Sequence, residues 1–276
     1  MNIKTIIKNL FQKKEILPYV NTPVLCGELL KDRTIAIAGG SGGIGVGIAK
    51  RCVANGAKVV LLGRNEDKLK AVCSELGKNA KFVIADFNDF ASYEDIVVKC
   101  DSQFEQKIDS LVNASGLMGK MNFFEITEKM WDDVMNINLK SVYFLSQKFA
   151  AYFIKNEIKG HIVNISSTSA LKPGWVPYGI SKAGVASMTV GLADELIKYG
   201  IVVNSVAPGP VATAMLGVNE KENNIINKRY KAGRYATPEE IGNWVAVMLS
   251  DMGQLVLGDS LYVSGGSGTL DICKKH

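Results

Sequence analysis

The chain has little of what metal centres, disulfide frameworks and membrane spans require. It contains two histidines (His161 and His276) and five scattered cysteines without C-x-x-C spacing. Cysteines of this number and spacing fit a reducing compartment and form neither a disulfide framework nor a zinc site. No run of about 18 apolar residues occurs, so we expect no transmembrane helix. These absences predict a cytoplasmic protein without a bound metal ion. The cysteines are Cys26, Cys52, Cys73, Cys100 and Cys273.

Internal repeats, low-complexity stretches and lysine clusters interleaved with aromatic residues are also missing. The lack of a basic, aromatic-rich patch argues against binding of nucleic acid. The composition, 47% hydrophobic and 21% charged, is typical of a globular domain with a substantial core. Because α/β domains reach about 250 residues without dividing, we expect one domain over residues 31–276 and an N-terminal extension over residues 1–30.

The extension begins with the pattern of a basic amphipathic helix. Its apolar residues recur at helical spacing with lysines between them. Such a helix over residues 1–14 can lie on an anionic membrane surface, or it can pack on the domain or on another subunit. We favour packing. The segment lacks the uninterrupted apolar region and the cleavage site of a signal peptide. The apolar positions are Ile3, Ile6, Ile7, Leu10 and Phe11.

Short apolar runs alternate with helical patterns along the rest of the chain. This alternation predicts a parallel sheet of about seven strands, doubly wound, with helices on both faces. Ligands of such sheets bind beyond the carboxyl ends of the strands. Strands are expected at residues 33–38, 58–62, 81–85, 108–113, 160–166, 201–206 and 260–263.

A glycine cluster, GGSGGIG, follows the first expected strand directly and leads into a helical run that ends at Gly56. Strand, glycine turn and helix in this order predict a dinucleotide-binding turn, because the backbone can approach a pyrophosphate and the helix N-terminus binds it. Gly39, Gly43 and Gly45 give the spacing G-x-x-x-G-x-G. Ser41 and Ile44 lie in the same turn and are expected to contact the coenzyme.

Tyr178 and Lys182 are four residues apart in a long helical pattern, so their side chains are neighbours on one helix face. A tyrosine hydroxyl, with its pKa of about 10, is a poor acid-base catalyst at neutral pH. An ammonium beside the ring favours the phenolate, so we expect Lys182 to lower the pKa of Tyr178.

These two features together resemble the short-chain dehydrogenase/reductase family, in its compact single-domain branch that includes the 3-oxoacyl-acyl-carrier-protein reductases. Further motifs follow in the family's order between about Leu30 and Gly268. The chain departs from the family pattern at Ala38, Ala114 and Ser264, where threonine, asparagine and aspartate are usual. The matching segments are Leu111–Gly116 (LVNASG), Asn136–Leu139 (NINL), His161–Ser167 (HIVNISS), Asn204–Thr213 (NSVAPGPVAT) and Tyr262–Gly266 (YVSGG).

The resemblance implies a Rossmann-type fold and an oxidoreductase that transfers a hydride between a nicotinamide coenzyme and a carbonyl or secondary alcohol. Tyr178 would be the acid-base, Ser167 would hydrogen-bond the reacting oxygen, Lys182 would also bind the ribose, and Asn138 would position a water that connects Lys182 to solvent. Tyr178 and Lys182 are thus expected at the coenzyme as well. The coenzyme contacts implied further along the chain are Asp86, Phe87, Asn113, Gly116, Pro208, Gly209, Val211 and Thr213.

Two adjacent serines compete for the catalytic position. Alignment with the family motif favours Ser167, which precedes Tyr178 by eleven residues, whereas Ser166 lengthens that separation by one. Neighbours on a strand point to opposite faces, so only one of them can meet the substrate. We expect Ser167 to do so.

The end of the second strand predicts the coenzyme. Relatives that use NAD place an acidic residue there, where this chain has Gly63 followed by Arg64. A guanidinium fork suits a 2′-phosphate, so NADP(H) is the expected coenzyme and NAD(H) the alternative. Arg64 stacked on the adenine, or merely solvated, is the other interpretation of this residue.

The sequence leaves the substrate open among a ketoacyl thioester, a keto-sugar and a hydrophobic ketone. In the family the substrate is shaped by the segment after the sixth strand, here residues 214–235, and by the loop at residues 168–177. Met118 and Trp175 are candidates for the pocket or for the core. A catalytically silent coenzyme-binding scaffold is the alternative function. The resemblance also implies a homotetramer, built partly through the helices after the fourth and fifth strands, or a homodimer.

Overall fold

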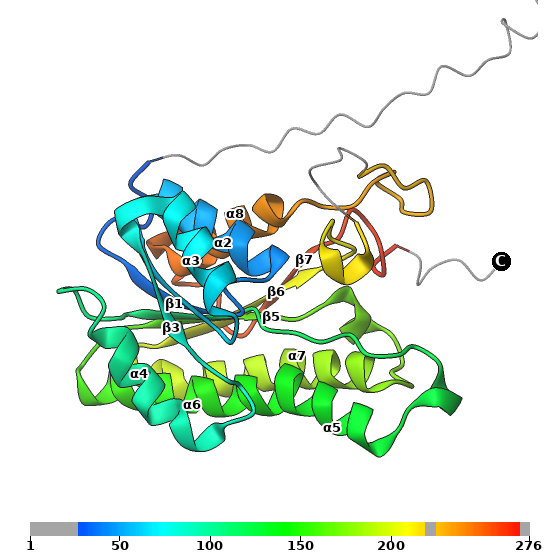
Figure 1. Ribbon diagram of the computed structural model, residues 1–276, viewed down its shortest axis with the longest axis horizontal. Helices are drawn as coiled ribbons and strands as arrows, with labels where there is room; N and C mark the ends of the chain where they lie inside the picture. Colours follow the sequence, from blue (N-terminus) through cyan, green and yellow to red (C-terminus); the bar gives the residue numbers. More distant parts are fainter. Residues whose placement is uncertain (1–26, 219–224, 271–276) are drawn as a thin grey trace, which may run out of the picture.

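A single parallel sheet organises the molecule. The computed structural model describes residues 27–218 and 225–270. Within them lie seven strands in the order β3-β2-β1-β4-β5-β6-β7, all paired in parallel (Figure 1). The predicted doubly wound fold with seven strands is therefore confirmed. The strands are β1 (Thr34–Ala38), β2 (Lys58–Gly63), β3 (Ala80–Ile84), β4 (Ser110–Asn113), β5 (His161–Ile165), β6 (Val202–Pro208) and β7 (Ser260–Val263).

Helices cover both faces of the sheet and explain why its central strands are continuous apolar runs. All residues of β1, β4, β5 and β6 are buried, as expected for strands that face helices on both sides. Figure 1 shows α2, α3 and α8 on one face and α4, α5, α6 and α7 on the other. The helices are α2 (Gly43–Ala54), α3 (Glu66–Leu76), α4 (Tyr93–Asp101), α5 (Glu128–Met135), α6 (Ser141–Lys155), α7 (Pro177–Leu196) and α8 (Pro238–Leu249).

Side-chain caps fix the start of several helices. The Asn65 side chain caps α3, Thr127 caps α5, and Thr237 forms a capping box with Glu240 at the start of α8. Helix α2 is different: its N-cap residue, Gly42, has no side chain to occupy the first amides. The N-terminus of α2 can therefore bind a ligand through these amides.

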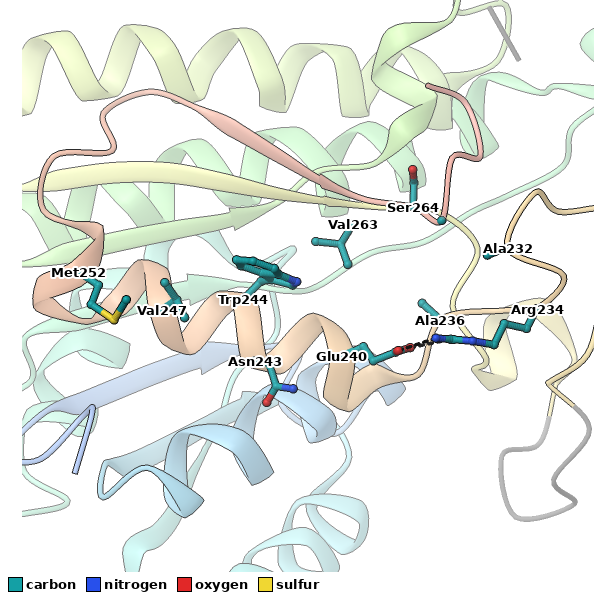
Figure 2. A pocket seen from close by; sticks show the side chains of 11 residues that line it. Ala232, Arg234, Ala236, Glu240, Asn243, Trp244, Val247, Met252, Val263 and Ser264 are labelled. Carbon is teal, nitrogen blue, oxygen red and sulfur yellow. Dashed lines mark hydrogen bonds and ion pairs between the residues drawn. The ribbon is translucent and has the colours of Figure 1, made fainter. Parts of the chain in front are cut away.

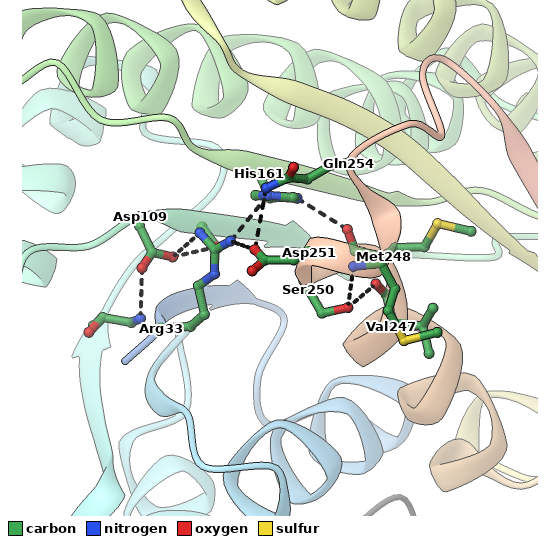
Figure 3. A network of polar contacts seen from close by, with 11 residues as sticks. Arg33, Asp109, His161, Val247, Met248, Ser250, Asp251 and Gln254 are labelled. Carbon is green, nitrogen blue, oxygen red and sulfur yellow. Dashed lines mark hydrogen bonds and ion pairs between the residues drawn. The ribbon is translucent and has the colours of Figure 1, made fainter. Parts of the chain in front are cut away.

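A polar network closes the amino ends of the strands, opposite the expected ligand site. The Arg33 guanidinium donates to Asp251 Oδ1 at 3.0 Å and lies 3.4 Å from His161 Nε2, while His161 Nδ1 is 3.2 Å from the carbonyl oxygen of Met248 (Figure 3). The Asp109 carboxylate accepts from the Thr34 amide at 3.3 Å. These contacts join β1, the start of β5, the loop before β4 and the end of α8.

Residues just before the predicted boundary at residue 31 pack against the sheet domain. Leu30 is fully buried in the core on the α2 face, and its amide donates to the carbonyl of Asn55 at 2.8 Å. The amphipathic pattern over residues 1–14 lies outside the described residues. No helix within residues 27–218 and 225–270 is long and apolar enough to cross a membrane.

Candidate active site

Two adjoining clefts lie at the carboxyl ends of β1, β2, β4, β5 and β6. The first has a volume of about 420 Å³ and is walled by the glycine turn and the ends of β2 and β4. The second, of about 320 Å³, contains Ser167 and Tyr178. Ile44, Thr213 and Met215 line both clefts, so an elongated ligand can occupy the two together.

The glycine turn leaves room for a ligand because side chains are excluded from it. Gly39 has φ +78°, and a Cβ at this position would lie 2.7 Å from the Ser115 amide nitrogen. A Cβ on Gly45 would lie 2.2 Å from the Gly39 carbonyl oxygen. Both positions therefore require glycine. The unblocked amides of α2 and this cradle fit the pyrophosphate of a dinucleotide, as the sequence predicted.

Three polar side chains gather at the far end of the first cleft. Ser41, Arg64 and Lys68 line it together with Gly63, and a Cβ on Gly63 would lie 3.3 Å from Ser41 Oγ. The first cleft is lined by two cations and, among the described residues, by no carboxylate. This end of the cleft is suited to an anionic group.

Lys182 is buried beneath the second cleft, where its ammonium hydrogen-bonds a backbone carbonyl. Its Nζ donates to the carbonyl oxygen of Ile165 at 2.8 Å and lies 6.0 Å from the centre of the Tyr178 ring. Burial lowers the pKa of Lys182 to about 8. The i, i+4 geometry predicted from the sequence thus places an ammonium that titrates near neutral pH beside the tyrosine.

The two serines point to different environments, as their neighbouring positions require. Ser166 Oγ donates to the Lys182 carbonyl at 3.2 Å, which ties β5 to α7. Ser167 Oγ accepts from the Ser169 amide at 3.1 Å, and Ser167 shares the second cleft with Tyr178, whose pKa its hydroxyl acts to lower. Ser167 is therefore the serine with the geometry to share a substrate oxygen with Tyr178.

The pKa of Tyr178 differs from the expectation based on sequence. Burial raises it, and the hydrogen bond with Ser167 opposes that rise only in part. Removal of the phenol from water sets the direction of the shift, and the opposing effect comes from Ser167 and not, as predicted, from Lys182. Tyr178 is consequently protonated at neutral pH, the form in which it can donate a proton.

Asn138 lies in a π-helical turn, Asn136–Lys140, between α5 and α6. Its side chain is fully buried, accepts from the Leu117 amide at 2.7 Å and donates to the Leu117 carbonyl at 2.8 Å and to Ser181 Oγ at 3.2 Å. π-Helical turns are frequent at functional sites. Here the turn aims Asn138 at the loop after β4, which it fixes next to the catalytic residues.

Most of the residues predicted for catalysis or coenzyme binding line the two clefts, but four do not. Asn138 and Lys182 lie behind the cleft wall. The Asn113 side chain points away, donating to Ser146 Oγ at 3.0 Å and Asn164 Oδ1 at 2.9 Å. Asp86 is exposed and accepts from the Asn88 amide at 3.0 Å. The predicted residues on the walls are Gly39, Ser41, Gly43, Ile44, Gly45, Arg64, Phe87, Gly116, Ser167, Tyr178, Pro208, Gly209, Val211 and Thr213.

Three further wall residues with polar side chains were not singled out from the sequence: Lys68, Lys172 and Tyr230. Ser115, Thr168, Ser169 and Ser267 add hydroxyl groups to the walls. Lys68 lies in the first turn of α3, just after Arg64, which precedes the helix. Lys172 and Tyr230 lie in the two segments expected to shape the substrate site. Met118 lines the second cleft, whereas Trp175 is 59% exposed and lines neither.

A separate cavity of about 480 Å³ lies between α8, the end of β7 and residues 232–236 (Figure 2). Its ionised pair, Arg234 and Glu240, is joined by hydrogen bonds of 2.7 and 2.8 Å. It shares no wall residue with the two clefts, and its two charged side chains are paired with each other. Within the described residues no group of His, Cys, Asp and Glu side chains could hold a metal ion.

Comparison with known proteins gives a consistent result. The sequence pattern of the family described as short chain dehydrogenase matches residues 33–224. A 3-oxoacyl-[acyl-carrier-protein] reductase of Rickettsia bellii is 32% identical over 240 residues, 86% of this chain and 97% of the relative. A 2-dehydro-3-deoxy-D-gluconate 5-dehydrogenase of Dickeya dadantii is 35% identical over 81% of this chain and 89% of its own. A short-chain dehydrogenase/reductase structure from Serratia marcescens superposes with a TM-score of 0.78 at 30% identity, covering 87% of this chain and all of the other (100%).

Proposed function

The chain belongs to the short-chain dehydrogenase family, and from this premise we propose that it is an NADP(H)-dependent oxidoreductase that interconverts a carbonyl and a secondary alcohol. The observation that carries the proposal is the meeting of Ser167, Tyr178 and the Lys182 ammonium at one cleft, continuous with a glycine-walled cleft for a dinucleotide. Membership of the family establishes an enzyme of the NAD(P)-dependent class. We propose in addition that the coenzyme is NADP(H) and that Ser167, Tyr178 and Lys182 take part in the reaction.

In the reductive direction, Tyr178 donates its proton to the substrate oxygen as negative charge develops there. Ser167 hydrogen-bonds the same oxygen. Donors aimed at a developing oxyanion each contribute about 3–4 kcal/mol when tested by removal. The bound nicotinamide coenzyme supplies the hydride. The Tyr178 phenol is protonated at neutral pH, as a proton donor must be.

Lys182 stabilises the phenolate that remains after Tyr178 has given up its proton, since its ammonium lies on the same helix face one turn away. The resemblance to the family assigns it the coenzyme ribose as well. Asn138 holds the loop after β4 through Leu117, and its predicted part in a water relay stays a prediction. Asp86 and Asn113 are proposed to support the coenzyme site indirectly. Asp86 fixes the turn after β3, and Asn113 ties the end of β4 to β5 and α6.

The preference for NADP(H) rests on the end of the first cleft. Ser41, Arg64 and Lys68 offer a hydroxyl and two cations where relatives that use NAD carry an acidic residue. This set fits a 2′-phosphate better than a 2′-hydroxyl. NAD(H) is the alternative coenzyme. Arg64→Ala should weaken NADPH binding about tenfold or more while changing NADH binding little.

A side-by-side fluorescence titration with NADPH and NADH tests the coenzyme. Tighter binding of NADPH that is lost in Arg64→Ala supports the proposal. Equal affinities, or tighter NADH binding, would contradict it. Lys70→Ala is the matched control, because Lys70 lies on α3 but pairs with Glu66 and lines neither cleft.

The relatives act on different carbonyl compounds by name, an acyl-carrier-protein thioester and a keto-sugar acid. They support a carbonyl or alcohol substrate for this chain without selecting one. A catalytically silent scaffold is less well supported, because such a protein has no chemical need for Asn138, Ser167, Tyr178 and Lys182 together.

We also propose a cytoplasmic homotetramer or homodimer, assembled partly through α6 and α7. An open groove between these helices is lined by Tyr143, Phe144, Met188 and Leu192, and Tyr143 is 44% exposed. Exposed aromatic side chains of this kind are enriched at subunit interfaces. Sedimentation velocity should give the mass of a dimer or tetramer, and a monomer at micromolar concentration would contradict the assembly.

A further inference from the structure

The cleft that contains Ser167 and Tyr178 has one charged side chain on its described walls, that of Lys172. The other wall residues are apolar, hydroxyl-bearing or glycine. Lys172 is exposed and, among the described residues, makes no ion pair or side-chain hydrogen bond. An unpaired ammonium beside the reacting groups is available to a ligand.

The backbone ties Lys172 closely to the catalytic serine. A single 3-10 turn, Thr168–Leu171, separates them: Ser167 caps its start and Lys172 ends it. The Lys172 amide donates to the Ser169 carbonyl at 3.2 Å. Lys172 is extended (φ −106°, ψ 149°), as the following proline demands. The position of its backbone is therefore fixed relative to Ser167.

The surroundings of the cleft add to its positive potential. Residues 166–178, 208–218, 225–236 and 264–270, which supply most of its wall, contain no aspartate or glutamate. Tyr230, another wall residue, directly follows Arg229 in the sequence. The Lys182 ammonium lies beneath the floor. A cleft lined by one sign of charge concentrates ligands of the opposite sign.

We infer that the carbonyl substrate is a small oxo acid, whose carboxylate binds Lys172 while its carbonyl oxygen faces Ser167 and Tyr178. This inference rests on the proposed function. An ammonium is a compact single charge, which matches one carboxylate. A cleft of about 320 Å³ that also receives part of the coenzyme has space for a short carbon chain beside it. Lys172 is thus a specificity-determining residue, and its partner is the anionic end of the substrate.

The test compares ligands that differ only in charge. The probes are 4-oxopentanoate and 5-oxohexanoate, each beside its uncharged amide, titrated into the full-length enzyme with NADPH bound. We expect the wild type to bind the better acid about tenfold more tightly than its amide. Lys172→Gln should abolish this preference while leaving the amide affinity unchanged, and Lys172→Arg should retain it. Lys155→Gln, at the exposed carboxyl end of α6, is the matched control and should behave as the wild type.

The outcomes separate this inference from the proposed function. Equal binding of acids and amides, binding of neither, or a preference that survives Lys172→Gln overturns the inference. Tighter Lys172-dependent binding of dihydroxyacetone phosphate than of either oxo acid overturns the assignment of a carboxylate. NADPH oxidation is followed in the same samples. Turnover of the amides without a preference for acids supports the proposed function and overturns the inference about Lys172. A preference for acids without turnover supports the carboxylate subsite and contradicts the proposed reaction.

Discussion

Tyr178 and Lys182 lie one helical turn apart. Burial raises the pKa of Tyr178 and lowers that of Lys182, and both shifts favour the uncharged form of the side chain. The phenol is held protonated, and the ammonium titrates near pH 8 instead of its usual value near 10.5. Once Tyr178 has given up its proton, the Lys182 ammonium beside it can supply another, because its own proton is easily lost. In the proposed reaction, Tyr178 donates its proton to the carbonyl oxygen from this protonated state.

The buried amine of Lys182 should make stability depend on pH. Between pH 8 and 10.5 the unfolded chain binds more protons at this position than the folded one, so folding becomes more favourable as pH rises through that window. Relative to Lys182→Met, the free energy of unfolding of the wild type should rise by on the order of 2 kcal/mol from pH 7.5 to pH 10. Urea unfolding of both proteins measures the difference, and a difference that does not change with pH would contradict the lowered pKa.

The two neighbouring serines should separate catalysis from packing. Ser167→Ala removes a donor to the reacting oxygen and should lower kcat by about 100-fold. Ser166→Ala removes a hydrogen bond between β5 and α7 and should lower the free energy of unfolding by about 1 kcal/mol with little change in kcat. Steady-state kinetics and urea unfolding of both variants decide the assignment. The reverse pattern would make Ser166 the catalytic serine.

At the scale of elements, His161 joins three of them at the amino end of the sheet. Burial, and then the Arg33 guanidinium, lowers the pKa of this imidazole to about 4. The neutral ring carries its proton on Nδ1, donates to the Met248 carbonyl and accepts from Arg33 at Nε2. A protonated ring would place two cations side by side next to Asp251 and break the contact with Arg33.

This contact should make the fold sensitive to acid. The stability contributed by neutral His161 is present above about pH 6.5 and is lost as pH falls towards 4, because the unfolded chain binds the proton more readily. Between pH 7 and pH 4.5 the free energy of unfolding should therefore fall less for His161→Gln than for the wild type. The difference between the two falls should be on the order of 2 kcal/mol. Chemical unfolding at the two pH values gives the comparison, and parallel losses in both proteins would show that other groups dominate.

The strands could be predicted from the sequence because strands buried on both faces must be apolar throughout. Each of the seven expected runs coincides with a strand to within two or three residues at its ends. The π-helical turn at Asn138 could not be predicted, since it depends on a contact with Leu117, twenty-one residues earlier. The ion pair of Arg33 with Asp251 spans 218 positions and is likewise absent from any local pattern.

At the scale of the whole molecule, the sheet order brings residues from five strand ends to one edge. Motif residues such as Gly39, Ser167 and Tyr178 could be placed at this edge from the sequence because their local patterns are distinctive. Lys68 and Lys172 could not, because a lone lysine in a loop or a first helical turn is ordinary until the fold places it on a cleft wall. The predicted lowering of the Tyr178 pKa was wrong because burial of the phenol, which raises the pKa, depends on the packed molecule and not on local sequence.

The central claim is that this cleft transfers a hydride with Tyr178 as the acid. The most direct measurement is NADPH oxidation by the wild type and by Tyr178→Phe, with a panel of carbonyl compounds and with NADPH affinity measured on the same samples. Turnover should fall by at least 100-fold in the variant while NADPH affinity stays within about threefold, because the hydroxyl acts on the substrate. Turnover retained by Tyr178→Phe, with its coenzyme binding intact, would contradict the account.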